Sequence, residues 1–236
     1  REAADKFGSQ HHEVLVKKEE FLDTARSMIL QRKEPLSVPN EVLLLLMTKQ
    51  VKTENTVVLS GEGADELFYG YDRIFRWAND SAWDLMEFAK YYSYGSHEDA
   101  DVVEDAISPF IDNQSCLNTV ARFFQISHLH GLLRRLDNST MLCSVEARVP
   151  FVDHRIVERL SGVSFADRMP NGIVKGSLKD AFADLVPHSI RHRKKVGFPV
   201  PLSDIFNASI DQTSTAMDQW LLYNLEVLTG IKWPAE

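Results

Sequence analysis

The sequence contains little cysteine and no long apolar run, and both shortages narrow the class of protein. Cys116 and Cys143 are its two cysteines in 236 residues, and neither lies in the Cys-x-x-Cys spacing of zinc and redox sites. Isolated thiols of this kind favour structural roles in a reducing, cytoplasmic setting. The longest apolar run, from Val42 to Met47, is too short to cross a bilayer, so we expect no membrane partner.

The sequence also has no excess of basic residues. The formal net charge is −8 and the isoelectric point is near 5.5, which argues against a nucleic-acid partner. Hydrophobic residues make up 44% of the chain and charged residues 25%, a balance typical of a compact globular domain.

The order of predicted elements indicates an α/β fold with a parallel sheet, because strands separated by helices favour parallel pairing. In the first part of the chain we expect a helix end over residues 1–8, a strand over 11–16, helices over 21–30 and 42–47, and a buried strand over 57–59. Residues 1–78 would then form an α/β part, and residues 79–236 a mainly helical part.

The second part is predicted to be helical from its apolar spacing. We expect an acidic loop with a short helix over 95–116, a long buried helix over 120–136, a helix capped by Asp153 and closed by Gly162, a helix over 178–186 stopped by Pro187, and a final helix over 216–228. His128 and His130 lie two apart on the long helix and therefore face apart, so a shared ligand role is not expected.

A glycine-bearing acidic turn carries the clearest chemical signal. Strand residues 57–59 run into Ser60-Gly61-Glu62-Gly63, and a helical pattern with Leu67, Phe75 and Ala78 on one face follows. This order is typical of a phosphate-binding geometry. Its carboxylates would repel a phosphate unless a divalent cation such as Mg²⁺ intervened. Ordinary charge complementarity at a helix N-terminus is the alternative explanation.

Further candidate residues lie outside the acidic turn, and some of them have a structural role as the alternative interpretation. Glu146 and Arg148 could form a structural ion pair or contact a substrate. Lys175 lies at the entrance of a predicted helix, where a solvated lysine is common. The basic loop over residues 191–201, with Arg193 and Lys195, suggests an anionic partner in an otherwise acidic chain.

The segment Ser60-Gly61-Glu62-Gly63-Ala64-Asp65-Glu66-Leu67 closely resembles the second signature of the asparagine-synthetase family. Further motifs agree with the family in order: the opening over residues 4–14, the Glu-x-Arg-x-Pro-Phe-x-Asp block over 146–153, the lysine and helix over 175–182, and the basic loop over 193–201. The resemblance implies a Rossmann-like PP-loop ATPase fold. It implies an ATP-dependent, glutamine-hydrolysing asparagine synthase that adenylates a carboxylate, releases pyrophosphate and transfers ammonia.

The resemblance also implies roles for individual residues. Ser60, Gly61 and Gly63, with Arg193 and Lys195, would contact ATP, and Asp65 would bind Mg²⁺. Glu62 and Lys175 would be catalytic. Glu62 would support adenylation and the incoming amine, whereas Lys175 would offset charge on the phosphorus and on pyrophosphate. Glu146, Arg148 and Asp153 would lie on the substrate side or serve the structure.

Several family features are missing from the sequence. The Ser-Gly-Gly-x-Asp-Ser pyrophosphate loop is absent and would fall before Arg1, as would the first strand and a glutaminase domain that supplies ammonia. We therefore expect a fragment that is truncated at its N-terminus, inactive alone, and a homodimer in its intact parent. Leu133 and Leu136 stand where asparagine synthetases hold their substrate, which favours a β-lactam-synthetase-like enzyme for another carboxylate as an alternative. The missing pyrophosphate loop leaves a non-catalytic assembly domain as a second alternative.

Overall fold

The chain forms two compact units, each made of three separate segments. A computed structural model describes residues 1–92, 100–195, 197–206 and 215–232. Unit 1 comprises Arg1–His11, Leu59–Arg134 and Arg148–Arg193, and unit 2 comprises His12–Val58, Arg135–Ala147 and Lys194–Glu236. Residue 78, where the sequence suggested a division, lies inside unit 1.

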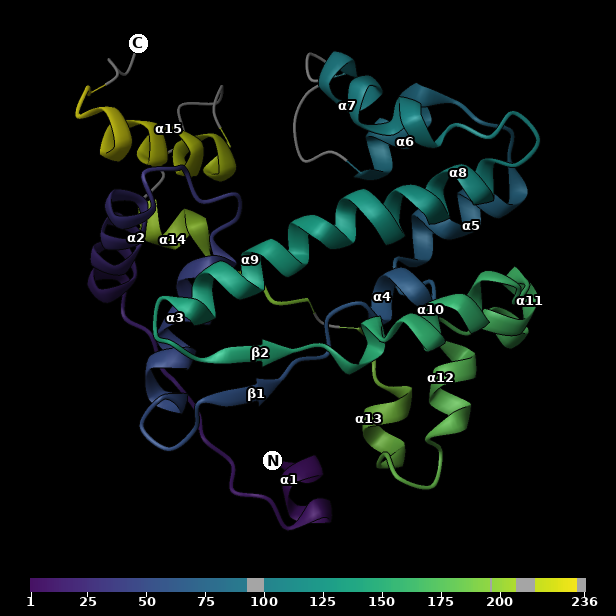
Figure 1. Ribbon diagram of the computed structural model, residues 1–236, viewed down its shortest axis with the longest axis horizontal. Helices are drawn as coiled ribbons and strands as arrows, with labels where there is room; N and C mark the ends of the chain where they lie inside the picture. The colour runs from purple at the N-terminus through teal and green to yellow at the C-terminus, as the bar shows by residue number, and fades with distance from the viewer. Residues whose placement is uncertain (93–99, 196, 207–214, 233–236) are drawn as a thin grey trace. The chain divides into compact units, whose positions relative to one another are not determined.

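The strands found in the described residues are β1 (Val57–Leu59) and β2 (Glu146–Arg148), which pair side by side (Figure 1). The amide of Glu146 donates to the carbonyl of Thr56, and the amide of Ser60 donates to the carbonyl of Arg148. This pattern is parallel, as the sequence predicted.

Two predictions about strands are wrong. Val57 is 42% exposed and Leu59 74% exposed, because a two-stranded sheet has too little surface to bury three consecutive apolar residues. Residues 11–16 adopt no strand conformation, and Leu15 is 90% exposed.

Unit 1 is helical around an aromatic core. Its core includes Phe75, Phe88, Phe123 and Phe124, which contact one another edge to face or tilted. Its helices are α1 (Glu2–Phe7), α4 (Ala64–Leu67), α5 (Asp72–Asp80), α6 (Leu85–Tyr92), α7 (Ala100–Ile107), α8 (Cys116–Phe123), α10 (His154–Ser161), α11 (Phe165–Arg168), α12 (Gly176–Ala181) and α13 (His188–His192), with 3₁₀ turns η2 (Ser108–Phe110), η4 (Pro150–Val152) and η5 (Pro170–Gly172).

The predicted long helix is present: α8 continues through a π-helical segment, η3 (Phe124–His128), into α9 (Leu129–Met141), which passes from unit 1 to unit 2. Two other helices are shorter than predicted. The pattern beginning at Leu67 is broken where Tyr69 takes a φ of 55°, and α12 ends at Ala181 rather than near Val186. Of the acidic stretch over 95–116, residues 95–99 lie outside the described residues, and α7 supplies the predicted short helix.

Unit 2 packs α2 (Lys18–Arg32), α3 (Asn40–Val51), α14 (Leu202–Phe206) and α15 (Ala216–Thr229) around a second core with Phe21, Leu45 and Trp220. The helices predicted over 21–30, 42–47 and 216–228 are therefore confirmed. None of the helices in the described residues combines the length and apolar character needed to traverse a bilayer.

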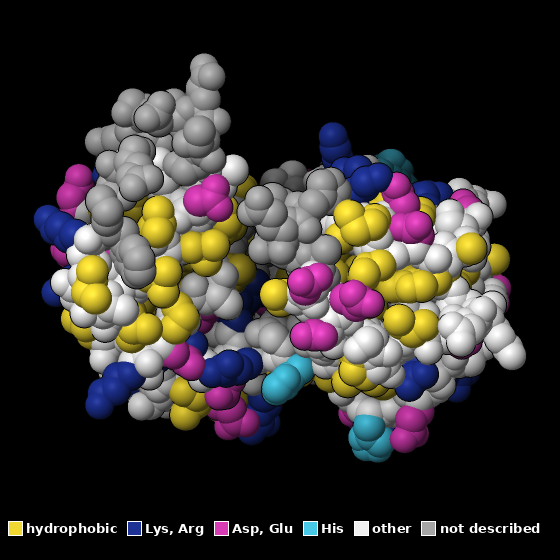
Figure 2. Space-filling view, turned by 90° about the horizontal axis from the view of Figure 1, so that it is seen from above, with side chains coloured by type: hydrophobic (Ala, Val, Ile, Leu, Met, Phe, Trp, Pro, Cys, Tyr) yellow, Lys and Arg dark blue, Asp and Glu magenta, His cyan; other side chains and the backbone are white. Residues whose placement is uncertain are grey.

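The two thiols agree with the structural role predicted for them. Both cysteines are unbonded thiols, and burial raises the pKa of Cys116 to about 11, which keeps that thiol protonated and supports a structural role. On the face drawn in Figure 2, acidic, basic and hydrophobic side chains are interspersed among the residues drawn in colour.

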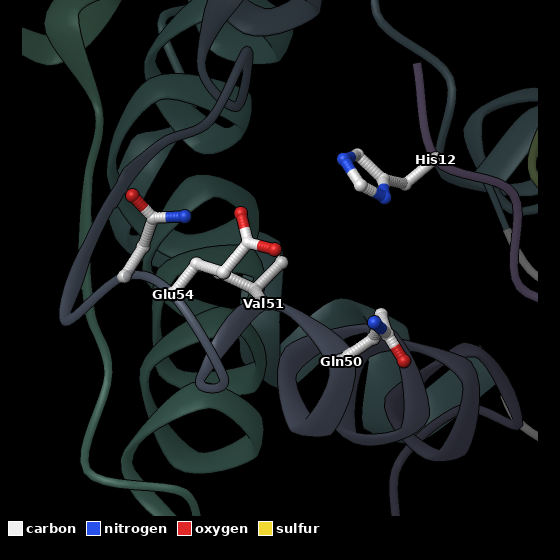
Figure 3. Close-up of a pocket in the computed structure, with 5 residues that line it drawn as sticks. His12, Gln50, Val51 and Glu54 are labelled. Atoms are coloured by element: carbon white, nitrogen blue, oxygen red, sulfur yellow. The ribbon is translucent and has the colours of Figure 1, made fainter. Parts of the chain in front are cut away.

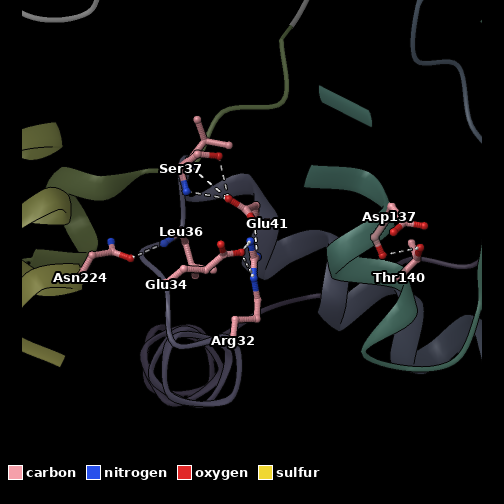
Figure 4. Close-up of polar contacts among 9 residues, drawn as sticks. Arg32, Glu34, Leu36, Ser37, Glu41, Asp137, Thr140 and Asn224 are labelled. Carbon is pink, nitrogen blue, oxygen red and sulfur yellow. Dashed lines mark hydrogen bonds and ion pairs between the residues drawn. The ribbon is translucent and has the colours of Figure 1, made fainter. Parts of the chain in front are cut away.

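A buried carboxylate ties the turn between α2 and α3 together (Figure 4). Glu41 is 1% exposed and accepts hydrogen bonds from the amide of Ser37 at 2.7 Å and its hydroxyl at 2.8 Å. Its second oxygen pairs with Arg32. The amide of Leu36 donates to Asn224 of α15 at 2.8 Å, so the turn is fixed against a second helix of unit 2.

Replacing Glu41 with alanine should lower the free energy of unfolding by about 3 kcal/mol, since breaking a buried ion pair leaves a charge without its partner. Urea denaturation checks this. The control is Glu87→Ala, which removes the exposed partner of Lys90 and should leave the urea midpoint unchanged. Equal effects of the two substitutions would contradict a buried role for Glu41.

Candidate functional site

The acidic turn follows β1 directly and needs glycine at a defined place. The amide of Ser60 is bonded to Arg148, and Gly61 is exposed with open space around it. Gly63 has a φ of 91°, and a Cβ there would lie 2.4 Å from Cγ2 of Val152. Both the backbone angle and the close approach therefore require glycine before α4 begins.

Lys175 reaches the turn from a distant part of the sequence. Its Nζ lies 2.9 Å from Oδ1 of Asp65, and the two side chains are 22% and 27% exposed. Lys175 itself has a φ of 54° at the N-cap of α12. A non-glycine residue in this conformation carries a strain of about 1 kcal/mol, and strain of this kind is concentrated at functional sites.

Gly70 is a site residue that the sequence analysis missed. A Cβ on Gly70 would lie 1.7 Å from Oδ1 of Asp65 and 2.5 Å from Cε of Lys175. The pair therefore packs directly on the bare backbone of Gly70. An isolated glycine inside an apolar helical pattern was the signal that could have drawn attention to it.

The next carboxylate on α4 points the other way. Glu66 is 1% exposed and accepts a hydrogen bond from the Tyr71 hydroxyl at 2.6 Å. Burial raises the pKa of Glu66, opposed by the bond from Tyr71, and the charges of Asp65 and Glu62 add to the rise. Burial, followed by the charge of Glu66, raises the pKa of Tyr71. Glu62, Asp65 and Glu66 thus act on one another electrostatically.

Arg168 holds the end of the same short helix. This buried guanidinium donates to the carbonyls of Leu67 at 3.0 Å and Val163 at 3.1 Å, and also to that of Leu160. It lies 4.5 Å from the ring centroid of Tyr69. A cation at the carbonyl ends of α4 and α10 satisfies acceptors that the helices leave open.

The remaining predicted site residues lie apart from the turn or contribute to structure. Asp153 caps α10 by accepting from the amide of Arg155 at 2.9 Å, and a side-chain bond from Arg155 holds its pKa well below the usual range. Glu146 and Arg148 share the exposed face of β2. Arg193 ends a segment of unit 1, Lys195 belongs to unit 2, and Val196 lies outside the described residues, so a role of the basic loop at the turn stays a prediction.

The described residues contain no group of three or more His, Cys, Asp or Glu side chains arranged to hold a metal ion. A cavity of about 90 Å³ in unit 2 is lined by His12, Gln50, Val51, Glu54 and Asn55 (Figure 3). None of the predicted site residues lines it. The acidic turn, with Lys175 and Gly70, is therefore the candidate site.

These features define a class of protein: a mainly helical α/β protein in which a lysine pairs with a glycine-bearing acidic turn. A family model described as asparagine synthase matches residues 1–221. The chain belongs to the asparagine synthase family. This confirms the resemblance drawn from the motifs, and the family implies the PP-loop ATPase fold.

Individual relatives are distant in sequence. The chain is 28% identical over 214 residues to asparagine synthetase [glutamine-hydrolyzing] 3 of Bacillus subtilis, covering 82% of this chain and 34% of that protein. It is 28% identical over 215 residues to the human asparagine synthetase [glutamine-hydrolyzing], covering 88% of this chain and 32% of that protein. The chain thus spans about a third of the length of these relatives.

Replacing Gly70 with alanine should destabilise the chain by about 1–3 kcal/mol, as overpacking does, because the new Cβ overlaps both members of the Asp65–Lys175 pair. Thermal or urea unfolding measures the loss. Gly131→Ala is the matched control: Gly131 lies in α9 with nothing within 4 Å of an added Cβ, so alanine should be neutral or stabilising. A Gly70→Ala chain as stable as the original would refute the close contact.

Proposed function

We propose that this chain is the synthetase part of an ATP-dependent amide-forming enzyme of the asparagine synthase type. The observation that carries the proposal is the 2.9 Å pair between Lys175 and Asp65. These residues come from two separate family motifs, and they meet on a turn whose glycines and carboxylates suit a metal-bound triphosphate. The names of the relatives support the same reaction class.

The residues of the turn fit a magnesium ion that carries a nucleotide. Mg²⁺ keeps several waters and takes only one or two protein carboxylates with substrate phosphates, so a cluster of three protein ligands is not required. Asp65 is partly exposed and already faces a cation, the Lys175 ammonium. Glu62 is half-buried in the same turn, and no atom lies within 4 Å of a Cβ built on Gly61, so the backbone there is accessible to a ligand. When bound, Mg²⁺ neutralises the charge of the phosphate oxygens.

In the proposed reaction, an oxygen of the carboxylate substrate bonds to the α-phosphorus of ATP, and the bond from that phosphorus to the bridging oxygen breaks to release pyrophosphate. Lys175 offsets the negative charge that develops on phosphorus and on the leaving group. Ammonia then attacks the acyl carbon, AMP departs, and Glu62 accepts a proton from the nitrogen.

We propose aspartate as the acceptor and glutamine as the source of ammonia, following the names of the relatives. Of the two leucines that suggested an apolar wall for a bulkier acceptor, Leu136 is 5% exposed and Leu133 is partly exposed. A β-lactam-synthetase-like reaction on another carboxylate therefore stays the alternative.

The test uses the full-length protein that carries this chain. Asp65→Asn and Lys175→Met should each reduce aspartate- and Mg²⁺-dependent pyrophosphate release by 100-fold or more, on the order of the loss of a preorganised charge at a transition state. Lys179→Met is the control, since it removes a neighbouring lysine of α12 and should leave the rate unchanged.

Equal rates for Lys175→Met and Lys179→Met would exclude Lys175 from catalysis. Pyrophosphate release with other carboxylic acids but not with aspartate would overturn the proposed acceptor while keeping the adenylation chemistry.

A further inference from the structure

We propose that Tyr71 and His128 are positioning residues for the acidic turn. They hold Glu66 inside the core of unit 1, and they thereby keep Asp65, the preceding residue of α4, turned toward Lys175. The value of this arrangement to catalysis rests on the proposed function, whereas the positioning itself can be tested without it.

The contacts form a directed chain. The Tyr71 hydroxyl donates to Oε1 of Glu66 at 2.6 Å, so its oxygen is available as an acceptor. Nε2 of His128 lies 3.2 Å from that hydroxyl oxygen and can donate to it. Nδ1 of His128 lies 3.2 Å from the hydroxyl of Tyr92 and can accept from it. One neutral tautomer of His128, protonated at Nε2, thus satisfies every link.

The long helix places His128 for this contact. His128 ends the π-helical segment η3, and an extra residue per turn changes the direction in which later side chains leave the helix. π-helical turns of this kind occur frequently at functional sites. The His128 ring packs edge to face against Tyr71, with ring centroids 5.5 Å apart, and it is held further by the rings of Tyr92 and Phe124.

Helix α4 cannot fix its own orientation. It has four residues and no side-chain hydrogen bond at its N-cap, and a helix of one turn has little stability of its own. Successive residues on a helix point about 100° apart, so burying Glu66 determines where Asp65 points. A buried carboxylate without hydrogen-bond donors would be drawn back to water, and the helix would turn with it.

Chemical labelling of Lys175 with an amine-reactive ester, followed by peptide mass spectrometry, tests this on the full-length protein. We expect Tyr71→Phe and His128→Leu to raise the labelling rate of Lys175 at least threefold relative to Lys90, which is 53% exposed. His128→Gln should restore slow labelling, because its amide nitrogen can donate to Tyr71.

Phe88→Leu is the matched control, since Phe88 is fully buried in the same core and takes no part in the polar chain. It should lower the melting temperature without changing the labelling of Lys175. If all variants label alike, or if Phe88→Leu raises the rate as much as Tyr71→Phe, the inference is wrong. If the Tyr71→Phe and His128→Leu variants label faster but the unsubstituted protein releases no pyrophosphate, the positioning is upheld and the proposed function is overturned.

Discussion

One turn of helix must expose one carboxylate and bury the next, and the candidate site depends on this constraint. Asp65 and Glu66 are adjacent on α4, yet Asp65 is partly exposed against Lys175 whereas Glu66 is 1% exposed. Tyr71 satisfies the buried carboxylate, and Arg168 satisfies the carbonyl at the end of the helix. A segment too short to be stable is thus fixed at its side and at its end.

The same turn brings separated motifs together through close packing. The Asp65–Lys175 pair rests on the backbone of Gly70, where a Cβ would collide with both side chains. Lys175 adopts a left-handed backbone conformation at this position. Because both partners are largely shielded from water, their attraction is screened less than that of a surface pair. Asp65, Gly70 and Lys175 therefore form one packed group, although they come from separate places in the sequence.

The sequence named both members of the Asp65–Lys175 pair but mispredicted the burial of β1, and the roles of the two residues stay predictions. Motifs named Asp65 and Lys175, and helical periodicity located most helices of both units, because these signals are local. The burial of β1 could not be predicted, since it depends on what covers the strand. Gly70, Tyr71 and His128 were missed because their importance comes from contacts between segments. Whether Arg193 and Lys195 share the site stays a prediction.

The acidic turn and the turn at Glu41 bury charged groups in different ways. In unit 2, the buried Glu41 is matched by Arg32 and by the Ser37 donors, as a buried carboxylate requires. At the acidic turn, a lysine adopts a strained backbone, a carboxylate is buried on tyrosine, and Arg168 is buried against carbonyls. Burying these charged groups has a desolvation cost that their hydrogen bonds offset, and under the proposed positioning the burial of Glu66 fixes the orientation of Asp65. Local rules broken together are expected at functional or strained sites, which supports the acidic turn as the proposed site.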